Sequence, residues 1–133
     1  MFEVGKSYIR RQLHDRYGGQ RQGGISTPAS YPVILLFTGG GGEKWGYRDH
    51  WESDGTFRFS GEGQRGNMEF RAGNKAIRDH AGNGEEIHLF ETDGHGHARY
   101  VGQLVYADHD LVPNVPDGTG RGRVAIVFHL ARR

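Results

Sequence analysis

The chain has 133 residues and a mass of 14.9 kDa, so we expect residues 1–133 to form one domain. It contains no cysteine, which excludes disulfides and thiolate metal sites, and its net charge of +1 says little about partners. The longest apolar run, Val33–Phe37, is too short to cross a bilayer, and no signal peptide opens the chain, so we expect a cytoplasmic protein without a membrane partner.

The first half of the chain predicts one short helix followed by strands. Ser7 can cap a helix over residues 7–17, and Gly18-Gly19 can end it. A polar loop is expected over residues 20–26. The strands expected after this loop cover residues 31–38, 45–51 and 56–60, with glycine-rich turns at 39–42 and 53–55.

The second half predicts another helix and more strands. Asn74 can cap a helix over residues 74–80, which Gly82 or Gly84 can end. Strands are expected at 86–91, at 98–107 and at the C-terminus, where Val124, Ile126, Phe128 and Leu130 share one face; residues 113–123 indicate a loop. The sum is a mainly β protein with two short helices, of the α+β class, and we expect a small, largely antiparallel β-barrel.

The glycine run at residues 39–44 resembles a phosphate-binding loop only in part. Glu43 stands where the motif before its lysine needs glycine, Trp45 stands where it needs serine or threonine, and no helix pattern follows. We therefore expect no nucleotide site of this type.

Histidine is frequent, with eight residues, but its spacing does not predict a metal site. His95 and His97 lie near Asp93, and His109 lies between two aspartates, without a third ligand that the sequence would place. We expect no metal, no cofactor and no catalytic group. An enzyme that holds a metal at His95 and His97 remains an alternative.

One stretch, residues 46–64, gathers groups that suit a flat polar ligand. Two strands joined by a tight turn would bring Tyr47 and Phe59 to the open end of one hairpin, with Asp49 and Ser60 beside them. Aromatic faces stack on bases, and a carboxylate accepts a hydrogen bond from an exocyclic amine such as N4 of cytosine. In the alternative interpretation both rings belong to the core and Asp49 is a turn residue.

The chain resembles the SRA (SET-and-RING-associated) domain, a PUA-like β-barrel that binds modified cytosine in DNA. More closely, it is similar to the SRA-like domains of modification-dependent restriction endonucleases that also carry an HNH nuclease. The matching segments occur in the family's order and cover nearly the whole chain: residues 17–26, 46–49, 59–64, 73–80, 88–91 and 124–130.

The resemblance implies that a modified cytosine is flipped out of the duplex and held between Tyr47 and Phe59. Asp49 would recognise the cytosine edge, with Ser60 as its hydroxyl partner. The side chains expected to contact DNA are Gln20, Arg21, Gln22, Gln64, Arg65, Lys75 and Arg78.

The resemblance also implies a non-catalytic reader of double-stranded DNA that contains 5-methylcytosine or 5-hydroxymethylcytosine. Such a reader fits a larger restriction enzyme in which an HNH nuclease domain is linked to it. The alternatives are a standalone reader of modified DNA, and a PUA-like barrel that binds RNA or a small ligand.

Overall fold

The computed structural model describes residues 1–39 and 47–133. The elements in chain order are β1 (Ser7–Ile9), α1 (Arg10–Tyr17), β2 (Ile25–Ser26), β3 (Val33–Thr38), β4 (His50–Trp51), β5 (Phe57–Ser60), α2 (Ala72–Asp79), β6 (Glu86–Thr92), β7 (His97–Pro116) and β8 (Gly122–Arg132). Within these ranges no helix is long and apolar enough to cross a bilayer.

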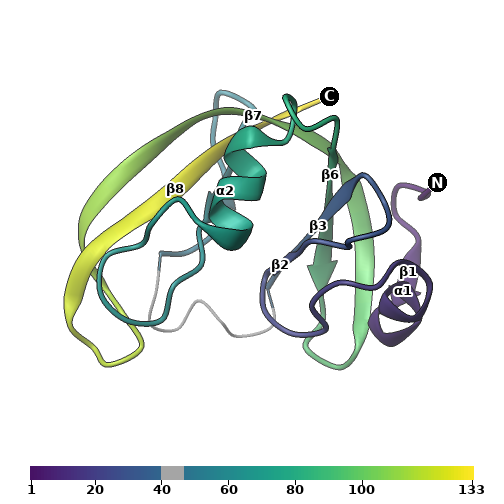
Figure 1. The fold of residues 1–133 in the computed structure, drawn as a ribbon, viewed down its shortest axis with the longest axis horizontal. Helices are drawn as coiled ribbons and strands as arrows, with labels where there is room; N and C mark the ends of the chain where they lie inside the picture. Colours follow the sequence, from purple (N-terminus) through teal and green to yellow (C-terminus); the bar gives the residue numbers. More distant parts are fainter. Residues whose placement is uncertain (40–46) are drawn as a thin grey trace.

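The strands form one mixed sheet in the order β2-β3-β6-β7-β8-β5-β4, with β1 paired to β7. The pair β3–β6 is parallel, and the other pairs are antiparallel. In the described part of the chain β2 and β4 stay at the two ends of this order, so the sheet is curved but not closed (Figure 1). The predicted α+β class with a largely antiparallel sheet is confirmed, although "barrel" describes its shape only loosely.

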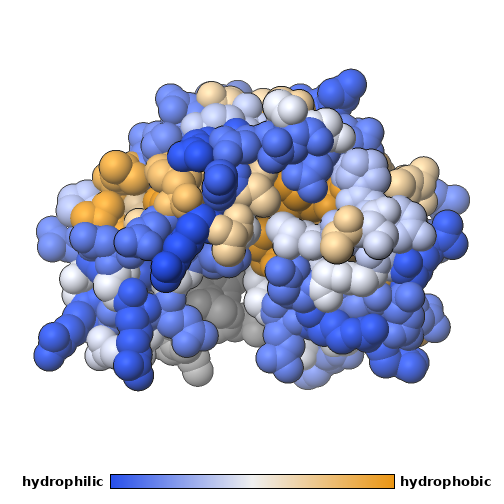
Figure 2. Space-filling model, viewed as in Figure 1, coloured by the Kyte–Doolittle hydropathy of each residue, from blue (hydrophilic) through white to orange (hydrophobic). Residues whose placement is uncertain are grey.

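Strand β3 is buried on both faces and separates two hydrophobic clusters. Ile34 and Leu36 belong to the cluster formed with β5, α2 and β8, whereas Val33, Leu35 and Phe37 belong to the cluster formed with α1, β6 and the start of β7. A strand covered on both faces needs a continuous apolar run, because alternate side chains point to opposite sides. The outer surface is mainly hydrophilic on the face seen in Figure 2.

The first predicted helix begins later than expected. Ser7 pairs with Arg99 as the start of β1, so the predicted cap at Ser7 is wrong and α1 begins at Arg10. Gly18 ends the helix as predicted, with a positive φ of 81° and its N–H bonded to the His14 carbonyl. The predicted loop over residues 20–26 also ends early, because β2 (Ile25–Ser26) pairs with β3.

Other boundaries also differ from the predictions. Of the strand predicted at 45–51, only His50–Trp51 is extended and paired as β4; residues 45–46 and most of the predicted turn at 39–42 lie outside the described residues. Helix α2 begins at Ala72, so Asn74 lies inside the helix and not at its cap. Strand β7 reaches Pro116 and β8 begins at Gly122, which shortens the loop predicted at 113–123.

Candidate functional site

A cavity of about 480 Å³ opens where several segments of the chain converge. They are the loop between α1 and β2, the end of β3, residues 47–49, the segment that leads from β5 to α2, the β6–β7 turn, and the β7–β8 connection with the start of β8. The residues that line it include Arg10, Gly23, Gly24, Phe37, Thr38, Tyr47, Asp49, Phe59, Ser60, Glu62, Gln64, Met68, Gly94, Gly96 and Arg123. A cavity of this volume lies within the range of small-ligand sites.

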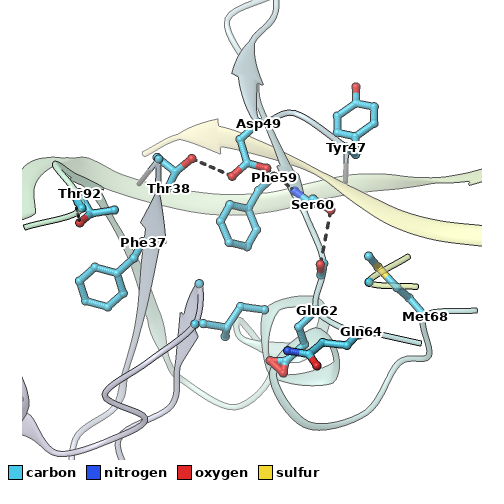
Figure 3. Close-up of a pocket in the computed structure, with 18 of the residues that line it drawn as sticks. Phe37, Thr38, Tyr47, Asp49, Phe59, Ser60, Glu62, Gln64, Met68 and Thr92 are labelled. Atoms are coloured by element: carbon cyan, nitrogen blue, oxygen red, sulfur yellow. Dashed lines mark hydrogen bonds between the residues drawn. The ribbon is translucent and has the colours of Figure 1, made fainter. Parts of the chain in front are cut away.

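The carboxylate of Asp49 joins two strand ends at the wall of this cavity. Its Oδ2 accepts a hydrogen bond from the Thr38 hydroxyl at 2.7 Å, and its Oδ1 accepts one from the Ser60 backbone N–H at 2.8 Å (Figure 3). Thr38 ends β3 and Ser60 ends β5. The position of the half-buried carboxylate is therefore fixed from two sides.

The two predicted rings border the cavity in different ways. Phe59 is 2% exposed and packs in the core cluster, yet its ring also faces the cavity (Figure 3). The Tyr47 ring points away from Phe59 and lies 5.7 Å from the His50 ring, centroid to centroid. Burial raises the pKa of the Tyr47 phenol. The two rings thus line one cavity without facing each other.

Glu62 and Ser60 supply further polar groups to the cavity wall. Ser60 Oγ makes one long hydrogen bond, at 3.4 Å, to the Gly61 carbonyl. Burial raises the pKa of Glu62, while a hydrogen bond from the Gly73 backbone N–H opposes that shift. A Cβ at Gly73 would overlap the Glu62 carboxylate, so glycine allows this close approach.

The predicted DNA-contacting residues 20–22 directly precede Gly23 and Gly24, which line the cavity. Their side chains are already engaged in part: Gln20 Oε1 accepts from the Thr27 backbone N–H at 2.6 Å, and Arg21 pairs with Asp15 at 2.9 Å. Gln22 is exposed. All three side chains are exposed, but Gln20 closes its own loop and Arg21 is paired.

The remaining predicted contacts fall in two places. Gln64 lines the cavity, and both Gln64 and Arg65 line an adjoining depression. Lys75 and Arg78 lie on α2, outside the cavity wall. The Arg78 guanidinium bonds to Asp79 at 2.8 Å, and this hydrogen bond lowers the pKa of Asp79.

Arg10, Met68 and Arg123 are among the lining residues that the sequence analysis did not predict. Arg123 is 8% exposed, and its Nη1 donates to the carbonyls of Gly63 and Gly66, each at 2.9 Å. No local pattern marks such a residue, because its partners lie about sixty positions away.

The segment that Arg123 braces is also held by Asp117. Hydrogen bonds from the Thr119 hydroxyl and the Gly66 N–H keep the pKa of Asp117 far below its usual value. Residues 63–66 are thus held from two sides.

The histidines considered as metal ligands lie on the β6–β7 turn and on β7. His97 Nδ1 is 3.4 Å from Asp93 Oδ2. In residues 1–39 and 47–133 no three histidine, aspartate or glutamate side chains gather as ligands. The turn instead supplies Gly94 and Gly96 to the cavity wall.

The family model for the SRA domain of ScoMcrA-like proteins matches residues 4–132. The chain belongs to this SRA family. No curated protein sequence matches the chain.

Solved structures share the fold of this SRA domain. The sulfur-binding and SRA domains of ScoMcrA complexed with phosphorothioated DNA superpose with a TM-score of 0.77 at 20% identity, over 99% of this chain and 40% of that one. The phosphorothioation-dependent restriction endonuclease ScoMcrA gives the same score and identity over 99% of this chain and 28% of its own. The SUVH5 SRA domain in complex with hemimethylated CG DNA gives 0.71 at 17% identity, covering 99% and 89%. This SRA domain therefore spans less than half of the ScoMcrA chains.

Proposed function

We propose that this SRA domain binds double-stranded DNA that contains a 5-modified cytosine and holds that base, flipped out of the helix, in the cavity. The observation that carries the proposal is the Asp49 carboxylate, fixed between two strand ends beside the cavity-facing ring of Phe59. The relatives fit: the SUVH5 SRA domain was solved with methylated DNA, and LpnPI is a cytosine modification-dependent restriction endonuclease.

Asp49 would select the base. Thr38 and Ser60 hold the carboxylate in place, and a carboxylate can accept several hydrogen bonds at once. An ionised Asp49 would accept from N4 of cytosine and disfavour thymine, whose O4 is itself an acceptor.

Stacking would supply the energy that base flipping costs. Extruding a base costs a few kcal/mol, and stacking on an aromatic ring returns about 1–3 kcal/mol per base. Phe59 offers one face. The Tyr47 ring would have to turn from His50 toward Phe59 to cover the other face, so the clamp closes when the base enters.

The contacts to the rest of the duplex would come from residues around and outside the cavity. The loop of Gln20, Arg21 and Gln22 would enter a groove beside the flipped base, and Gln64, Arg65, Lys75 and Arg78 would contact the flanking DNA. The domain would act as the reader of a longer restriction enzyme with a linked HNH nuclease, so the purified domain should bind DNA without cutting it.

A binding panel tests this proposal. Otherwise identical duplexes carry cytosine, 5-methylcytosine, 5-hydroxymethylcytosine or thymine at one position, and an RNA of the same sequence competes. A 2-aminopurine beside the target reports unstacking by its fluorescence. We expect tighter binding to a modified duplex, with a fluorescence rise. Equal affinity for all duplexes, or modified-DNA binding with every base still stacked, contradicts the proposal.

A further inference from the structure

Arginine pairing differs between the cavity and the rest of the molecule. Four arginines of the described chain are at least partly buried: Arg10, Arg58, Arg78 and Arg123. Arg58 pairs with Asp54 and Asp110, and Arg78 pairs with Asp79. Within residues 1–39 and 47–133, Arg10 and Arg123 have no carboxylate within 4 Å, and both line the cavity. Burial of a charge without an opposite charge is costly, so this pattern calls for an explanation.

The two unpaired arginines are held differently. Arg123 is nearly enclosed and braces the carbonyls of Gly63 and Gly66, which explains its place structurally. Arg10 is only half-buried. Its guanidinium lies 3.9 Å from the centroid of the Phe37 ring, and the residue lines the cavity.

Two hydrogen bonds fix the orientation of Arg10. Its Nε donates to His14 Nε2 at 3.1 Å, and its Nη2 donates to the Gly23 carbonyl at 2.9 Å. His14 can accept there because its other ring nitrogen, Nδ1, bonds to the Gly18 carbonyl at 2.9 Å. These bonds engage only part of the guanidinium's fork of N–H donors.

The surroundings of Arg10 suit a phosphate group. Figure 3 shows Phe37, on which Arg10 stacks, apart from Glu62, and among the described residues no carboxylate lies within 4 Å of the Arg10 guanidinium. The neighbouring wall consists of Gly94 and Gly96, and the Gly96 carbonyl accepts from the Arg10 backbone N–H at 2.8 Å. Glycines leave room for a sugar-phosphate backbone to approach closely.

We propose that Arg10 binds a backbone phosphate of the DNA next to the flipped nucleotide. This inference rests on the proposed function. A planar guanidinium matches the oxygens of a phosphate, and such contacts position DNA without reading its sequence. Arg10 would therefore set affinity and register, and Asp49 would set the choice of base.

The test uses three substitutions of Arg10 and one matched control. Arg10→Gln removes the charge. Arg10→Met removes the charge as well but keeps an apolar side chain packed on Phe37, and Arg10→Lys keeps the charge. Arg11→Gln removes an exposed charge from the next position of the same helix, outside the cavity wall. Dissociation constants are measured on modified and unmodified duplexes over a series of salt concentrations, and thermal melting verifies that each variant folds.

We expect Arg10→Gln and Arg10→Met to weaken binding to both duplexes by a similar factor, about tenfold, and to reduce the slope of log K against log salt by about 1. Arg10→Lys should restore the slope, and Arg11→Gln should change neither quantity. A loss of affinity with an unchanged slope overturns the inference, because it shows a structural role alone. If the wild type does not prefer modified DNA, the proposed function fails, while the slopes still decide the role of Arg10; if it binds no duplex, both fail.

Discussion

Asp49 has a structural task and a proposed chemical one. Its two oxygens hold the Thr38 hydroxyl and the Ser60 N–H, which joins the end of β3 to the end of β5. The same carboxylate would then meet the N4 amine of the base already oriented, without loss of side-chain freedom on binding. Substitutions that separate the two tasks are therefore informative.

Asp49→Asn should remove the preference for cytosine over thymine at the target position. The substitution replaces one acceptor oxygen by a donor, which should cost about 1–3 kcal/mol of discrimination. Titration of both duplexes measures it. The control is Thr38→Val, which removes one anchor but keeps the carboxylate; it should lower affinity less and retain the preference. An Asp49→Asn protein that folds and discriminates like the wild type would refute the role of Asp49.

Gly73→Ala should destabilise the fold. The added methyl would overlap the Glu62 carboxylate and lie 2.8 Å from Ile25 Cγ2, so we expect a loss of about 1–3 kcal/mol in the free energy of unfolding. Gly82→Ala is the matched control, because its nearest neighbour is the Asp79 carbonyl at 3.7 Å. Urea unfolding compares the two, and equal midpoints would contradict the close packing inferred at Gly73.

Among the elements, β7 connects the two sides of the sheet. This 20-residue strand pairs with β1 and β6 in its first half and with β8 in its second half. Its pairing with β8 shifts register twice, at Tyr106/Asp108 and at Val112/Val115. Such bulges bend a strand and increase its twist, which accounts for the curved hairpin of β7 and β8 in Figure 1.

Substitution of Asn114 tests whether the second bulge, between Val112 and Val115, needs its backbone conformation. It has a positive φ of 60°, a conformation that glycine and asparagine adopt far more easily than β-branched residues. Asn114→Val should destabilise the protein by about 1–2 kcal/mol, whereas Asn114→Gly should be tolerated. Chemical denaturation of both variants provides the measurement, and an Asn114→Val protein as stable as the wild type would show that the bulge does not need this conformation.

Considered as a whole, the molecule places its cavity between the two hydrophobic clusters. Phe37 belongs to one cluster and Phe59 to the other, and both rings contribute to the cavity wall. Packed cores resist deformation. We therefore expect the walls formed by these two rings to be rigid, whereas the proposed clamp requires the Tyr47 ring to turn.

Two buried histidines should make the stability of the whole fold depend on pH. Burial lowers the pKa of both His14 and His88 below the ordinary value of histidine, about 6.5. Their contribution to stability is complete above pH 6.5 and is lost as the pH falls through their folded-state pKa values, because the unfolded chain then binds more protons. His50, whose pKa is raised chiefly by its bond to the Arg48 carbonyl, acts in the opposite sense but is only partly buried.

We therefore expect the melting temperature to fall as the pH is lowered from 7 to 5. His88→Gln should make this dependence shallower, and the exposed residue His95 provides the control in His95→Gln. Calorimetry at several pH values measures the effect. A wild-type melting temperature that rises over this interval would show that the sign is wrong.

The sequence by itself determined the features that depend on local pattern. Three local patterns predicted the strands that form the two hydrophobic clusters. They are the apolar run from Val33 for β3, the turn before β5, and the alternation from Val124 to Leu130 for β8. The order of family segments also pointed to Tyr47, Asp49, Phe59 and Ser60, which the structure places around one cavity.

The tertiary structure decided the features that depend on distant partners. β1 and β2 are three and two residues long, too short for a period to show, and they are strands only because β7 and β3 pair with them. Arg10 reaches the cavity wall because α1 packs beside Phe37 and the β6–β7 turn. A cavity forms from segments that are separated in the chain, and a one-dimensional pattern does not contain the distances between them.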